Sequence, residues 1–193
     1  MLSQVKKSSR SLFIAFVLSV PLTVAAQKLE KPVIDKFAND TTYFTTTEKI
    51  AATKSSMSQS VENIEAYLSK KKGVVFGHFS LVLSIDDHKC YHVTAGNQIL
   101  LKLADNSIVS LSCIDDRQPK RISYGSHFLK TLDWACWSAD IPFGLVENDF
   151  KKIAASPVVS IRIQTDEQNY DFDIKPKDTA TLSKMFQLIV NAR

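Results

Sequence analysis

Three side chains that can bind a metal ion alternate along one short segment of the 193-residue chain. His88, Cys90 and His92 are each separated by a single residue, and in an extended strand such alternate side chains point to the same face. Imidazole and thiolate are good ligands for zinc or copper, and Asp86 or Asp87 could add an oxygen ligand. The pattern therefore predicts a candidate zinc site.

The geometry of a strand limits which of these side chains can share one ion. Alternate Cα atoms lie about 6.5–7 Å apart, so three ligands from one straight strand are strained. A workable site uses Cys90 with one of the histidines and a donor from elsewhere, such as His78. The alternative is an ordinary strand, in which Tyr91 and Val93 form the buried face.

Catalytic motifs are missing from the sequence. It contains no G-x-S-x-G, P-loop, G-x-G-x-x-G, H-E-x-x-H or C-x-x-C pattern. Cys113 and Cys136 fall on apolar faces of expected strands, where cysteine usually serves as a small hydrophobic residue. We therefore predict no catalytic residues, and favour a protein that is not an enzyme.

Two tryptophans are candidates for a binding surface. Trp134 and Trp137 lie in an expected long strand over residues 128–141, three positions apart, so their side chains point to opposite faces. One of them could line a surface groove, because tryptophan is enriched in binding hot spots. The alternative is that both are buried, as large aromatic side chains mostly are.

The N-terminus has the pattern of a secretory signal peptide. Residues 1–26 contain three basic side chains and no acid, an apolar run over 12–18 and small residues up to Ala26. The apolar stretch is shorter than the roughly 20 residues of a membrane-spanning helix, which favours cleavage near Ala26 over a retained anchor. The sequence thus predicts export to the periplasm or the medium, with no transmembrane anchor after processing.

The charge balance excludes one class of partner. The chain has 24 Lys and Arg against 20 Asp and Glu, and removing residues 1–26 leaves it close to neutral. A near-neutral chain lacks the positive field that nonspecific binding to nucleic acid or to an anionic membrane needs. We expect no nucleic-acid partner.

The remaining chain predicts a single α+β domain over residues 57–193, preceded by an extended or loop segment over 27–56. A helix is expected first, with Val61, Ile64 and Leu68 on one face and the Lys70 to Gly73 run at its end. Apolar periodicity and turn residues then predict strands over 75–85, 88–94, 99–103, 108–113, 128–141, 159–164 and 170–174. They also predict a short helix over 147–154 and an amphipathic closing helix that carries Leu182, Met185, Phe186 and Ile189.

These elements favour a mainly antiparallel sheet or small barrel on which an N-terminal helix, a short helix and a C-terminal amphipathic helix pack. The sequence also predicts a hairpin with a two-residue turn at Asp105 and Asn106. Its buried side chains would be Leu101, Leu103, Val109, Leu111 and Cys113.

Several short segments resemble uncharacterised exported α+β proteins of Gram-negative bacteria. They are Ile34-Asp35-Lys36-Phe37 with Asp40-Thr41-Thr42, the hairpin from Leu101 to Leu111, and Val159 to Thr165 followed by Tyr170. Such proteins often have a glycine in the hairpin turn, where this chain has Asn106 and Ser107. The resemblance implies an envelope or secreted location and a shared fold, and it implies no activity.

The function that these observations favour is an exported, noncatalytic binding or interaction module of the bacterial cell envelope. Its partner would be an envelope protein or a small ligand, with no cofactor unless zinc binds. Two alternatives stay open. One is an envelope enzyme whose site is assembled from residues distant in sequence, and the other is a metal-binding protein that uses His88, Cys90 and His92.

Overall fold

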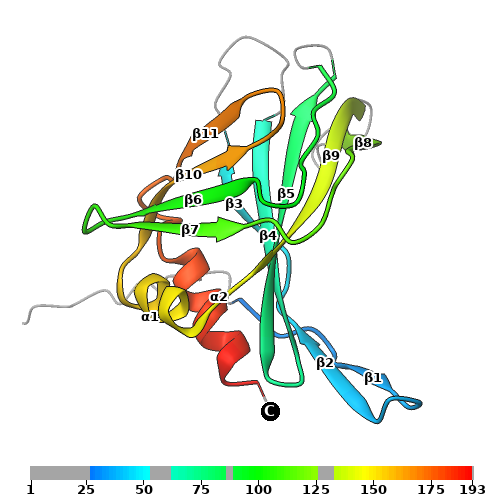
Figure 1. Cartoon of the computed structure of the whole chain (residues 1–193), viewed down its shortest axis with the longest axis vertical. Coiled ribbons are helices and arrows are strands. Elements are labelled where there is room, and N and C mark those ends of the chain that lie inside the picture. Colours follow the sequence, from blue (N-terminus) through cyan, green and yellow to red (C-terminus); the bar gives the residue numbers. More distant parts are fainter. Residues whose placement is uncertain (1–26, 53–61, 86–88, 126–132, 193) are drawn as a thin grey trace, which may run out of the picture.

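Strands dominate the fold. The computed structural model describes residues 27–52, 62–85, 89–125 and 133–192 (Figure 1). Strand pairing takes up 54% of these residues and helix 13%. The prediction of an α+β fold with three helices is therefore wrong, although the expected antiparallel pairing is confirmed. The described residues form two antiparallel sheets, the larger one curled into a half-barrel, with two short helices at one end.

The large sheet has seven strands in the order β1-β2-β4-β5-β9-β8, with β3 also paired to β4. Its strands are β1 (Val33–Asp35), β2 (Asp40–Phe44), β3 (Glu48–Ala52), β4 (Glu62–Lys71), β5 (Val74–Ser84), β8 (Lys120–Gly125) and β9 (Asp133–Gly144).

The segment expected to be an N-terminal helix is strand β4. Ile64, Ala66 and Leu68 alternate along it and are buried in the core, which is the period of a strand. Lys71 pairs with Val74 of β5, so Lys72 and Gly73 form a two-residue hairpin turn. Both have positive φ, 49° and 80°, as a type I′ turn requires. The lysine–glycine pair that suggested the end of a helix is the turn of a hairpin.

Strands β2 and β3 follow one another along the same edge of β4, and Thr45 makes the break between them. Its backbone N–H donates to Leu68 O at 2.9 Å, and its hydroxyl accepts the Leu68 N–H at the same distance. The buried hydroxyl thus replaces a backbone acceptor where the edge strand is interrupted.

The small sheet has the order β11-β10-β6-β7, from β6 (Gln98–Leu103), β7 (Ile108–Ser112), β10 (Val158–Gln164) and β11 (Asn169–Asp173). The predicted β6–β7 hairpin is confirmed, and its expected apolar face is buried. Its loop has three residues rather than two, because Leu103 N–H bonds to Ser107 O and Asn106 takes the left-handed conformation at φ 67°.

The core lies between the two sheets, whose strands cross in Figure 1. Helices α1 (Glu147–Ala155) and α2 (Thr181–Val190) pack on each other, and α2 also contacts β3 and β4. The short helix and the amphipathic closing helix are both as predicted, and the expected side chains of the closing helix are buried, namely Leu182, Met185, Phe186 and Ile189. An edge-to-face contact between Phe150 and Phe186, 4.9 Å between centroids, joins the two helices.

Candidate functional site

The segment predicted to carry the metal ligands is a loop over its described part, residues 89–97, rather than a strand beside β5. Both sides of β5 are occupied by β4 and β9. Tyr91 fixes the loop to β5 and β9, because its buried hydroxyl donates to Leu81 O and accepts the Ala139 N–H. Val93 forms a bridge to Arg117 and is buried as well. Tyr91 and Val93 are therefore the buried side chains of this segment, as the alternative interpretation expected.

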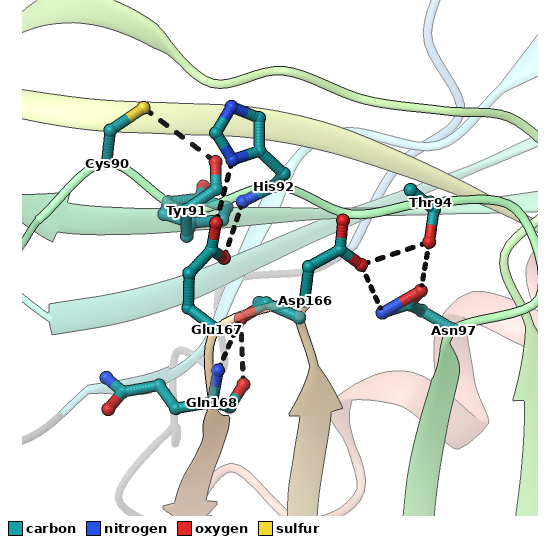
Figure 2. Close-up of polar contacts among 9 residues, drawn as sticks. Cys90, Tyr91, His92, Thr94, Asn97, Asp166, Glu167 and Gln168 are labelled. Atoms are coloured by element: carbon teal, nitrogen blue, oxygen red, sulfur yellow. Dashed lines mark hydrogen bonds and ion pairs between the residues drawn. The ribbon is translucent and has the colours of Figure 1, made fainter.

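Figure 2 shows how the loop is tied to the turn between β10 and β11. His92 contacts Glu167 twice, from Nδ1 to Oε1 at 2.7 Å and from the backbone N–H to Oε2 at 2.8 Å. Asp166 lies 3.0 Å from the Thr94 hydroxyl and 3.1 Å from Asn97 Nδ2. Burial raises the pKa of Glu167, but the hydrogen bonds from His92 outweigh it and lower the pKa overall. These contacts fasten the loop to the small sheet.

The arrangement leaves the zinc hypothesis as a prediction. His88 lies outside the described residues, and Cys90 contacts the Tyr91 carbonyl, 3.8 Å from its sulfur. His78, the suggested donor from elsewhere, uses Nδ1 to contact Asp140. Within residues 27–52, 62–85, 89–125 and 133–192, no three His, Cys, Asp or Glu side chains are grouped to hold a metal ion.

A cluster that the sequence did not indicate lies on the outer face of the large sheet. Tyr67 and His78 are paired across β4 and β5, and their rings stack at 4.3 Å between centroids. Both contact Asp140 Oδ2, Tyr67 at 3.1 Å and His78 at 3.2 Å. Burial, together with the Asp140 charge, raises the pKa of Tyr67 to about 12. The phenol stays protonated at neutral pH, which suits a structural hydrogen bond and not a general base.

The two tryptophans differ in what the structure says of them. Trp137 is half-buried and packs against the core. The side chain of Trp134 lies outside the described part of the chain, although its backbone pairs with Tyr124. A binding role for either tryptophan stays a prediction.

An open groove lies between the two helices and the β4–β5 hairpin. It has a volume of about 650 Å³, within the range of small-molecule sites. Three segments far apart in the sequence line it: the hairpin around Gly73, helix α1 with the preceding Leu145, and the last turns of α2. Their apolar side chains are Val74, Val75, Leu145, Phe150, Ala154, Phe186 and Val190.

The polar side chains of the groove are cationic or neutral. Lys70 donates to the carbonyls of Val190 and Ala192 at 2.8 and 2.9 Å, and so places its ammonium group at the C-terminal end of α2. Lys151 lines the groove from α1, Gln187 lines it from α2, and Asn191 lines it directly after the end of α2. Among the described lining residues there is no carboxylate. The groove therefore offers an apolar wall with positive charge beside it.

A second, smaller hollow continues the apolar surface past the groove. It shares Val74, Val75 and Leu145 with the groove and has a volume of about 350 Å³. Val146 and Ile114 line it and are exposed to solvent. Together these side chains extend the apolar surface from α2 toward the edge of the small sheet.

The two helices are too short to cross a bilayer, and no other helix is present in the described part of the chain. Comparison of the chain with family models, curated proteins and solved structures finds no match. The resemblance to exported Gram-negative proteins therefore stays a prediction, and the groove is the feature on which a functional argument can be built.

Proposed function

We propose that the protein is an exported, noncatalytic binding module of the cell envelope that holds an amphiphilic, anionic small molecule in the groove between α1, α2 and the β4–β5 hairpin. The observation that carries this proposal is the groove itself, with about 650 Å³ of space, apolar walls and lysines at its side. Pockets of this size and character are the usual sites of small-molecule ligands.

The exposure of the groove side chains supports binding over simple packing. Val74 is 51% exposed and Val190 is 45% exposed, although both are large aliphatic residues. Covering them with the body of a ligand removes apolar surface from water, worth roughly 25 cal/mol for each Å². The positive charge of Lys70 beside the groove favours a carboxylate, sulfonate or phosphate on that ligand.

The described ionisable groups give less support to the alternative of an envelope enzyme than the groove gives to a binding module. The Tyr67, His78 and Asp140 cluster lies on the outer face of the large sheet, and the raised pKa of Tyr67 keeps its phenol protonated. The groove brings apolar side chains together, and these select a ligand by shape and hydrophobicity.

Export rests on the N-terminal pattern, with its basic residues, short apolar run and small residues before Gln27. On this proposal the exported protein begins at or near Gln27. The intact mass of the protein, expressed from the full sequence with residues 1–26, tests the cleavage. A mass that still includes residues 1–26 would contradict export by a cleaved signal.

The groove is tested with 8-anilinonaphthalene-1-sulfonate, which combines apolar rings with a sulfonate. We expect the chain from residue 27 to bind one equivalent saturably in calorimetry, with enhanced probe fluorescence. The substitution Val74→Glu should weaken binding at least tenfold, because it places a carboxylate in the apolar wall beside the site of the anion. Ile108→Glu is the matched control, since Ile108 is 59% exposed and lies on β7, outside the groove.

Near-UV circular dichroism of each variant checks that the fold is intact, because this probe also binds loosely packed states. Loss of binding in Val74→Glu with full binding in Ile108→Glu supports the groove. Equal weakening in both variants, or binding without saturation, would refute it. N-phenyl-1-naphthylamine, which has the rings without the charge, should bind more weakly; equal affinity would remove the anionic part of the proposal.

A further inference from the structure

The β1–β2 hairpin extends from the lower end of the molecule in Figure 1, beyond the strands of the core. Its turn, residues 36–39, carries Phe37, whose relative exposure is 104%, so the whole ring is in water. Val33 and Ile34 on β1 are adjacent and therefore point to opposite faces, and both are more than half exposed. The hairpin thus presents apolar side chains at its tip and on both faces.

The tip is held in shape by local hydrogen bonds. Asp35 accepts the backbone N–H of Phe37 at 2.9 Å and of Ala38 at 3.0 Å, and these two bonds lower the pKa of its carboxyl group. Asn39 takes a positive φ of 47° at the end of the turn. Phe37 is therefore presented by an ordered turn, and its exposure follows from the geometry of the hairpin.

Lysines flank the hairpin in sequence and lie beside its base. Strand β2 pairs with the end of β4, which brings the Lys70 to Lys72 run next to the hairpin. Residues 28–40 and 70–75 together contain six lysines against three carboxylates. One of the carboxylates, Asp40, lies 3.8 Å from Lys71 and offsets its charge. Although the chain from residue 27 is almost neutral as a whole, this end of it carries a local positive excess.

We infer that this end of the molecule docks on an anionic phospholipid bilayer, with Phe37 inserted among the lipids and the neighbouring lysines against the headgroups. An exposed apolar tip and adjacent cationic side chains are the two signals that together give stable, reversible attachment to a membrane surface. The positive charge favours a bilayer over an apolar pocket of another protein, because only the bilayer offers a broad anionic plane around the inserted tip. The inference does not depend on what the α1–α2 groove binds.

The test is sedimentation of the chain from residue 27 with sucrose-loaded vesicles, so that residues 1–26 contribute nothing. Vesicles of equal parts phosphatidylglycerol and phosphatidylcholine should bind the protein, and vesicles of phosphatidylcholine alone should bind it much less. Raising the NaCl concentration to about 0.5 M should weaken the binding, because salt screens exposed charges. Phe37→Ser should lower the partition coefficient at least tenfold, since it removes the inserted ring.

Charge is tested with Lys36→Gln and Lys72→Gln, each of which should lower partitioning about fivefold. The controls are Lys102→Gln and Ile108→Ser, which remove an exposed lysine and an exposed aliphatic side chain from the β6–β7 hairpin. Phe37 is fully exposed, so its replacement should leave the melting temperature unchanged.

The depth of the tip is measured with Phe37→Trp and lipids brominated in the acyl chains. Quenching beyond that of the unsubstituted protein, which has two tryptophans of its own, shows insertion. The inference is overturned if the protein does not bind phosphatidylglycerol vesicles, in which case the hairpin docks on a protein instead. It is also overturned if the Phe37 and control variants bind equally well, or if no additional quenching occurs.

Discussion

Gly77 is the position at which one added methyl group should cost the fold most. It lies on β5 opposite Phe143 of β9, and the Phe143 ring covers it. A Cβ atom at residue 77 would overlap three ring carbons of Phe143. The ring is buried and stacks on Phe79 at 4.8 Å between centroids, so it has no open space to move into. Gly77→Ala therefore overpacks the core between the sheets.

The cost can be placed within known limits. Overpacking a well-packed core typically costs 1–3 kcal/mol, and the crowding around Phe143 puts Gly77→Ala near about 3 kcal/mol. With an m value of about 2 kcal/mol/M, the urea midpoint should fall by about 1.5 M. Gly144→Ala is the matched control, because its Cβ would meet only Ile114 at an ordinary 3.7 Å. That variant should stay within about 0.5 kcal/mol of the parent protein.

A double-mutant cycle shows whether the ring is the cause. Phe143→Leu alone should cost about 1.5 kcal/mol, and the double variant Gly77→Ala/Phe143→Leu should be more stable than the sum of the two costs by about 1–2 kcal/mol. Urea unfolding followed by circular dichroism supplies all the free energies. Additive costs, or a loss below about 1 kcal/mol in Gly77→Ala, would show that Phe143 does not pack over Gly77.

Two further predictions concern a turn and a titration. Asn106→Ala should lower the free energy of unfolding by about 1 kcal/mol, because Asn106 has a φ of 67°, which alanine rarely adopts. Asn106→Gly should be tolerated, because glycine adopts positive φ readily. Equal stability of the two variants in urea would contradict the left-handed conformation at residue 106. The pKa of Tyr67 is about 12 in the folded chain against 10 ordinarily, so the unfolded chain loses this proton first. Stability should therefore fall as pH rises from about 10 to 12, and the fall should be smaller in Tyr67→Phe; a fall of equal size in the two proteins would contradict the raised pKa of Tyr67.

The elements that the sequence predicted correctly are those whose determinants are local. The β6–β7 hairpin has alternating apolar residues on both sides of a turn that contains Asn106, and the closing helix has its four apolar side chains at helical spacing. In each case the residues that define the element lie within about 15 positions of one another. Even there, the hairpin loop was one residue longer than expected, because a three-residue loop also places a single residue in the left-handed region.

Strand β4 shows why a non-local element was assigned wrongly. Ile64 and Leu68 are four residues apart, a spacing that fits one face of a helix and also one face of a strand. The following lysines and Gly73 fit both the end of a helix and a type I′ turn. The strand is chosen by its partners: β5 pairs with it along its whole length, and β2 and β3 pair with its other edge. None of these partners can be identified from the periodicity of β4 itself.

The candidate surfaces, like strand β4, are formed by segments far apart in the sequence. The distribution of charge is the clearest example. Totals over the chain from residue 27 are nearly neutral and argued against an anionic surface as partner. The net charge does not say where the charged side chains lie, however. An electrostatic interaction between exposed charges weakens within a Debye length, about 8–10 Å at physiological salt. Pairing of β2 with the end of β4 places Lys71 and Lys70 opposite Thr42 and Tyr43, beside the hairpin that carries the exposed Phe37. A surface that a bilayer could recognise is therefore created by strand pairing, in a chain whose composition alone argues against one.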